Sequence, residues 1–333
     1  MPTQSNIRKS LINNRDFIMT IAILWIGVFH FPINTNLPVI GFIKSIGYGG
    51  VDLFVMLSGF GLYHSLLKFD NDNYINVGAF LKNRAKRMLP SYFPFLIIWI
   101  ICKKLFDKIY MTEIFGNITM TGWWNGDQNQ FNWYLDLLLL LYLLAPIIYT
   151  LIKQSANIRR TFVFLMVFAF CIGVAFFHGQ LIQAMSRLPI FLIGMLIGDL
   201  DNPHWNNAPK LRAVLDNKFF WIAISVLGFV LMYLCMHQTR LDLWHYGLYW
   251  YPFLLITPGL AILLANIGNH LPHWCGGLGR ASLEIFLWHI GIYELLLYRV
   301  PLNLIPWIGI FVLGFTVGYG YHQLIRYIKK KFI

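Results

Sequence analysis

Apolar residues in this sequence gather into long runs that short polar stretches separate. A transmembrane helix needs roughly 20 mostly apolar residues to cross the hydrocarbon core. A β-barrel would show short alternating segments instead, and the nearly continuous apolar run at 135–144 does not alternate. The pattern predicts an all-α, polytopic helix bundle of about ten spans, at residues 17–34, 46–67, 88–106, 132–152, 161–177, 186–200, 218–236, 248–266, 281–298 and 304–324.

Composition supports a membrane protein and excludes a water-soluble globule. Of the 333 residues, 58% are hydrophobic and 12% are charged, whereas a soluble domain carries about 25% charged residues. The net charge of +12 raises the question of nucleic acid, but most Lys and Arg residues lie between alternate runs. This asymmetry follows the positive-inside rule and places both termini in the cytoplasm, so no nucleic-acid partner is expected. Lys103, Lys104 and Lys108 fall on the predicted outer side, or the third span ends elsewhere.

The chain shows no long linker, low-complexity segment or clear repeat. Residues 1–333 are therefore expected to form a single membrane-embedded domain, with no appended soluble domain and with a retained first span. The four cysteines are scattered and predict neither a disulfide framework nor a metal site.

Ionisable side chains inside lipid-spanning helices cost roughly 2.5–3.5 kcal/mol each on insertion scales, which makes every one a functional candidate. His30 ends the first predicted span, and a neutral imidazole can take a proton from a hydroxyl near neutral pH. The alternative is a histidine hydrogen-bonded between helices. Long side chains near span ends, such as Arg187 and Arg299, can extend to the interface and therefore indicate less about function. The remaining candidates are Asp52, Asp136, Glu284, His289 and Glu294.

Two segments near the second and third spans suggest binding chemistry. Glycines at 47–50 and 59–61 permit close helix packing, or expose backbone N–H groups to an oxyanion. Asp52 either orients a histidine, binds a sugar hydroxyl or starts a helix at the interface. Arg84 and Arg87 share one helix face and suit bidentate capture of phosphates such as those of coenzyme A. Contact with anionic lipid is the alternative for this pair.

The segments around Glu284 and around Trp133 give weaker indications of a functional site. Glu284 and His289 are five residues apart, so they do not share one helix face. Trp133, before Asp136, is typical of an interfacial aromatic belt.

Taken in order, these segments resemble the acyltransferase-3 family of integral membrane O-acyltransferases. The resemblance covers nearly the whole chain. It rests on a first span ending in histidine and on the segments GVDLFVMLSGF (50–60), FLKNRAKRMLPSYF (80–93), WYLDLLLLLYLLAP (133–146), RLPIFLIGMLIG (187–198) and LGRASLEIFLWH (278–289).

The resemblance implies that an acyl group, typically acetyl from cytoplasmic acetyl-CoA, is transferred to a hydroxyl of a surface or lipid-linked glycan. It assigns the family's essential histidine to His30 and its paired arginines to Arg84 and Arg87. Members commonly carry a basic residue eleven positions before the histidine, where this chain has Met19, one helical turn after Arg15. Many relatives carry an extracytoplasmic domain that completes transfer, so here either the membrane domain acts alone or a separate extracytoplasmic partner takes part.

We therefore expect an O-acetyltransferase of the cell inner (plasma) membrane, using acyl-CoA as donor substrate and holding no bound cofactor or metal. His30 acts as general base or carries the acyl group. The alternative is a transporter or flippase of a lipid-linked glycan, because intramembrane acids and glycine-interrupted helices suit that class too. The residues expected to support the site are Arg15, Asp52, Ser58, Trp133, Glu284 and His289.

Overall fold

The computed structural model describes residues 5–71, 74–125, 133–175, 181–237 and 251–332. Within these ranges the regular structure is helical apart from one isolated bridge between Asp70 and Ile75, which confirms the predicted all-α class. Among the described residues, eight segments are long and apolar enough to cross a membrane: α1 (Asn6–His30), α3 with η1 (Gly49–Phe69), α4 (Val77–Phe106), α6 (Trp133–Lys153), α7 (Ile158–Ala175), α8 with α9 (Ile182–Asp199), α11 (Lys218–His237) and α15 (Leu304–Phe332). The chain is a multi-pass membrane protein.

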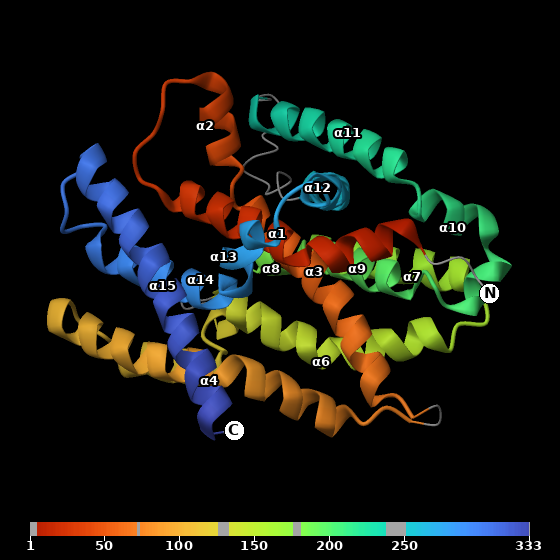
Figure 1. Ribbon diagram of the computed structural model, residues 1–333, viewed down its shortest axis with the longest axis horizontal. Helices are drawn as coiled ribbons and strands as arrows, with labels where there is room; N and C mark the ends of the chain where they lie inside the picture. The colour runs from red at the N-terminus through yellow and green to blue at the C-terminus, as the bar shows by residue number, and fades with distance from the viewer. Residues whose placement is uncertain (1–4, 72–73, 126–132, 176–180, 238–250, 333) are drawn as a thin grey trace. The chain divides into compact units, whose positions relative to one another are not determined.

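Shorter helices complete the element order (Figure 1). Helices α12 (Phe253–Gly268) and α14 (Ser282–Leu296) lie at the two remaining predicted spans and contain 16 and 15 residues. Positions 248–250 of the predicted span 248–266, and position 132 of the span 132–152, lie outside the described residues. The remaining α-helices are α2 (Pro38–Ser45), α5 (Met111–Thr119), α10 (Pro209–Leu215) and α13 (Gly277–Arg280).

Helix ends differ most from the prediction where a helix continues beyond the apolar run. Helix α1 begins at Asn6 rather than at residue 17, and α4 begins at Val77 rather than at residue 88. Hydropathy detects only the part of a helix that faces lipid, whereas backbone hydrogen bonding continues through polar turns in water or headgroups. As a result, Arg84 and Arg87 lie on α4 itself.

The chain divides into two compact units, each described separately below. The first unit contains Met1–Ile18, Asp52–Leu81 and Leu137–Pro272. The second unit contains Met19–Val51, Lys82–Asp136 and His273–Ile333.

Close contact between α3 and α9 characterises the first unit. A Cβ added at Gly59 would lie 2.3 Å from the Phe191 carbonyl oxygen, and one at Gly194 would lie 2.1 Å from that of Met56. Asp52 and Arg187 form an ion pair of 3.1 Å between these helices, with side-chain exposures of 2% and 1%. Arg187 lies near the end of a predicted span, where a long side chain can reach the interface, but here a buried carboxylate holds its guanidinium inside.

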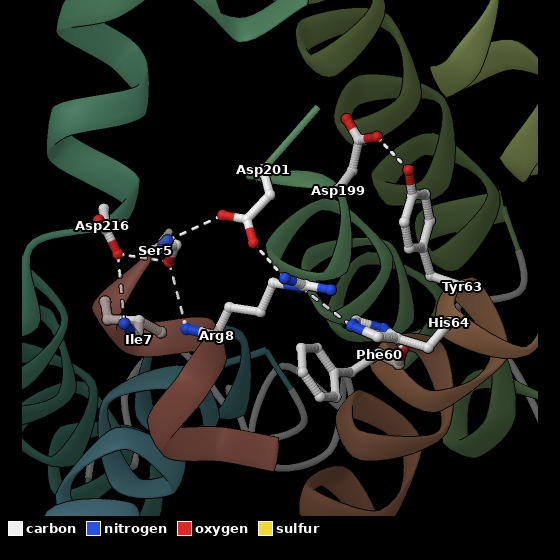
Figure 2. A network of polar contacts seen from close by, with 9 residues as sticks. All are labelled: Ser5, Ile7, Arg8, Phe60, Tyr63, His64, Asp199, Asp201 and Asp216. Atoms are coloured by element: carbon white, nitrogen blue, oxygen red, sulfur yellow. Dashed lines mark hydrogen bonds and ion pairs between the residues drawn. The ribbon is translucent and has the colours of Figure 1, made fainter. Parts of the chain in front are cut away.

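Polar contacts also hold the start of α1 within the first unit (Figure 2). Arg8 pairs with Asp201 and donates a hydrogen bond of 3.0 Å to His64 Nε2. The Ser5 backbone N–H donates to Asp201 at 2.8 Å, and the Ser5 hydroxyl donates to Asp216 at 2.5 Å. Arg8 thus ties the start of α1 to α3 and to the loop that follows α9.

In the second unit, α14 and α15 run side by side (Figure 1). Glycines on α15 allow this approach. A Cβ added at Gly318 would lie 2.5 Å from Ile285 Cα, and one at Gly314 would lie 3.0 Å from His289 Cα. The backbone of α15 therefore fixes the position of α14, which carries two of the predicted site residues, Glu284 and His289.

Gly318→Ala is expected to destabilise the protein by about 1–3 kcal/mol, because the added methyl group overpacks a backbone contact. Gly320→Ala is the matched control on the same helix, since its Cβ would meet nothing within 4 Å. That variant should be neutral or slightly stabilising, because Ala favours helix over Gly. Thermal unfolding of both purified variants in detergent tests this, and equal melting temperatures would contradict the packing account.

One of the three lysines on the predicted outer side, Lys103, has a structural explanation. Helix α4 ends at Phe106, where the sequence predicts the end of the span. Lys103 pairs with Glu113 of α5 and lies 3.4 Å from Glu294 of α14. The ammonium group is neutralised by these carboxylates, so its charge does not oppose the positive-inside rule.

Candidate active site

His30 is the last residue of α1, two residues before Pro32. Its Nδ1 lies 2.9 Å from the Ile26 carbonyl oxygen, one turn back along the helix. A carbonyl oxygen only accepts hydrogen bonds, so Nδ1 carries the hydrogen and Nε2 keeps its lone pair. The ring is half-buried. The local helix thus orients His30 as a proton acceptor through Nε2.

The His30 ring lies against α14. Its centroid is 5.2 Å from that of His289 and 5.9 Å from that of Tyr293, while Phe29 lies 5.1 Å away on its own helix. His289 is only 5% exposed. Within the second unit, the two histidines predicted as site residues are therefore brought together, although 259 positions separate them in the sequence.

Glycines just before α3 and in its first turn pack against α1. A Cβ at Gly50 would lie 2.5 Å from the Ala22 carbonyl oxygen, and one at Gly47 would lie 2.7 Å from Phe29 Cβ. Close packing accounts for both glycines, in agreement with the first of the two sequence interpretations. These contacts fix the final turns of α1, and with them the position of His30.

Glu284 is the centre of a second group of polar side chains. It is 6% exposed, and its two carboxylate oxygens accept hydrogen bonds from Ser91 Oγ at 2.6 Å and from His322 Nδ1 at 3.1 Å. The Tyr321 hydroxyl donates to the Ser91 carbonyl oxygen at 2.9 Å. Helices α4, α14 and α15 therefore meet at one buried carboxylate.

Ser91→Ala is expected to destabilise the protein by about 1–3 kcal/mol, because it leaves a buried carboxylate oxygen without its donor. Ser45→Ala is the control, since that hydroxyl donates to the neutral Phe42 carbonyl oxygen from a half-buried position. Chemical unfolding of the two variants in detergent would measure the difference. An equal loss would show that Ser91 contributes no more than an ordinary local hydrogen bond.

Helices α4 and α14 connect the histidines to the arginines. Glu284 and His289 are separated by about 7.5 Å of helix axis, and they contact different partners, as the spacing predicts. Ser91, which binds Glu284, follows Arg87 by about 6 Å along α4. Arg84 is half-buried and Arg87 is exposed, and Lys329 Nζ binds the Arg87 carbonyl oxygen at 3.3 Å. One continuous set of contacts thus runs from His30 to the arginine-bearing turn of α4.

Three of the predicted site residues belong to the first unit. Asp52 is paired with Arg187, as described above, and Ser58 is half-buried on α3. Arg15 is half-buried and approaches Gly61, whose added Cβ would lie 3.9 Å from Arg15 Nε.

The other predicted residues lie in the second unit. Trp133 is half-buried, with its ring 5.8 Å from that of Trp123. Asp136 accepts a hydrogen bond of 3.1 Å from the Trp123 backbone N–H.

Sequence reasoning missed two residues of the Glu284 group. His322 lies inside the predicted span 304–324, so a full count of ionisable groups in the spans would have found it. Ser91 carries no comparable signal, since a serine in an apolar helix is common.

Comparison with known proteins identifies the family of the chain. A family model described as an acyltransferase domain, that of acyltransferase-3, matches residues 14–321. No curated protein and no solved structure matches the chain. The matched range includes every site residue predicted from the sequence and ends one residue before His322. The chain belongs to the acyltransferase-3 family of membrane acyltransferases.

Proposed function

We propose that this membrane acyltransferase moves an acyl group, in the simplest case acetyl, from cytoplasmic acyl-CoA to a hydroxyl of a surface or lipid-linked glycan. The observation that carries the proposal is the orientation of His30. Its Nδ1–H is engaged by Ile26, its Nε2 is left with a lone pair, and its ring lies against α14. A hydroxyl nucleophile needs such a proton acceptor, whereas transport does not.

In the proposed reaction, His30 Nε2 takes the proton of the glycan hydroxyl as that oxygen attacks the thioester carbon. A carbon–oxygen bond forms and the carbon–sulfur bond breaks. The imidazolium then returns the proton to the departing thiolate, which leaves as free coenzyme A. The products are the acylated glycan and a thiol, and the enzyme is unchanged.

Donor binding is assigned to the Arg84 and Arg87 turn of α4. Guanidinium groups three residues apart on a helix face one way and bind phosphate oxygens bidentately. Ser91, Glu284 and α14 link this turn to His30 through contacts within the second unit, so the proposal places the donor's phosphates and its thioester at the two ends of that set of contacts.

The proposal also assigns the membrane topology, the domain organisation and the presentation of the glycan, on the basis of a donor that binds from the cytoplasm. Both termini lie on the cytoplasmic side of a bacterial inner membrane. Residues 1–333 act as one membrane-embedded catalytic domain. A separate extracytoplasmic partner, where present, presents the glycan.

Reconstitution tests the proposal. The purified protein in lipid nanodiscs, given acetyl-CoA labelled in the acetyl group and glycan from cells lacking the gene, should transfer label to the glycan in an alkali-labile ester. Glycans from cells with and without the gene should differ by the mass of the acyl group. Unchanged acylation together with lost glycan export would instead assign the chain to transport.

A further inference from the structure

His289 is a buried imidazole without hydrogen-bonding partners among the residues that the structure describes. It is 5% exposed, and neither Nδ1 nor Nε2 has a donor or acceptor within reach there. An unsatisfied buried polar group costs about 1–3 kcal/mol. Apolar side chains of similar size would avoid this cost, so the imidazole calls for an explanation other than packing.

The surroundings hold the His289 ring in place. Gly314 of α15 lies directly against its backbone, where an added Cβ would be 3.0 Å from His289 Cα and 3.3 Å from His289 Cβ. The Phe315 ring packs edge-on at 5.7 Å between centroids. The free nitrogens are thus carried on a side chain whose direction α15 fixes, beside His30 at 5.2 Å.

We infer that His289 is a second catalytic residue, which donates a ring N–H to the acyl carbonyl oxygen as the tetrahedral intermediate forms. The inference rests on the proposed function and adds to it the group that stabilises the developing oxyanion. His30 is unsuited to this role, because its one hydrogen in the neutral state is engaged by Ile26. His30 therefore transfers the proton, and His289 stabilises the negative charge on the oxyanion.

The chemistry needs His289 to stay neutral throughout. When His30 holds the hydroxyl proton it is a cation, and a second cation at this separation in an apolar surrounding would be strongly repelled. Neutral His289 keeps one N–H for the oxyanion. That hydrogen bond strengthens as charge moves from the carbonyl group onto its oxygen, and it weakens when the carbon–sulfur bond breaks and the ester carbonyl forms.

Two substitutions of similar length separate this role from a packing role. His289→Gln keeps an N–H donor on a flexible side chain, and His289→Met has similar bulk but no donor. Loss of one oxyanion donor costs about 10²–10³-fold in kcat. We expect His289→Met to lose that much in kcat with a KM for acetyl-CoA within about twofold of the wild type. His289→Gln should recover at least tenfold over His289→Met.

Melting temperatures of both variants in nanodiscs identify the fraction of folded protein, to which kcat is normalised. The inference is overturned by full kcat in His289→Met, by equal kcat in the two variants, or by a raised KM with unchanged kcat. If His289→Met does not fold, His289→Phe replaces it in the same comparison.

Failure of this inference and failure of the proposed function give different results. A wild-type protein that transfers no label, or a His30 variant with full transfer, would remove the proposed function itself. A wild type that requires His30 while His289→Met keeps its kcat removes only the role of His289.

Discussion

Replacing His30 by asparagine is expected to lower kcat for acyl transfer about 10²–10⁴-fold, the range that a general base contributes. Asparagine is chosen because its side-chain N–H can replace Nδ1–H in the bond to the Ile26 carbonyl oxygen. The end of α1 should then keep its structure. What is lost is the lone pair of Nε2, since an amide group is not basic near neutral pH.

Transfer of labelled acetate to glycan measures the loss, with insertion and melting temperature determined for each variant. His270→Asn is the control, because His270 is exposed after α12 and lies outside the proposed chemistry. If the His30 variant inserts normally and retains the wild-type rate, the residue is a hydrogen-bonded structural histidine and the enzymatic mechanism described above is wrong.

The second large effect is expected from Arg84→Gln combined with Arg87→Gln. Hydrogen bonds to charged groups contribute about 1.5–3 kcal/mol each, so losing both should raise KM for acetyl-CoA about 10²–10⁴-fold. The effect on kcat should be smaller, because the phosphates lie far from the thioester. Initial rates at increasing acetyl-CoA concentration separate the two parameters.

Lys82→Gln combined with Lys86→Gln is the matched control on the same helix. Both lysines are exposed, and the pair removes the same formal charge. A KM raised equally by the two double variants would show a general charge effect. An activity that instead follows the content of anionic lipid in the nanodisc would favour the lipid-contact alternative for the arginines.

The helical class and eight of the ten expected spans could be predicted, because a helix that crosses lipid is apolar over most of its length. Each span must satisfy its own backbone, so apolar length and helix coincide. The first turns of α4 could not be placed in this way, since residues that face water or headgroups are polar whether helical or not. The early start at Val77 became evident only from the backbone.

Contacts between residues that are far apart in the sequence could not be predicted for the candidate site. His30 was identifiable from its chemistry and its place at the end of a span. Its neighbour His289 and the partnership of Asp52 with Arg187 depend on which helices adjoin, and apolar periodicity does not specify this. The family match favours the enzyme over the transporter that the sequence left as an alternative.

The shortness of α14 is explained by its surroundings. Its 15 residues extend about 22 Å, whereas the hydrocarbon core is about 30 Å thick. None of these 15 residues is exposed, so other parts of the protein and not lipid surround the helix. A helix enclosed by protein does not have to match the thickness of the hydrocarbon core, because its ends can find polar partners inside the bundle. The carboxylate of Glu284 and the imidazole of His289 can therefore be held on a membrane helix without facing acyl chains.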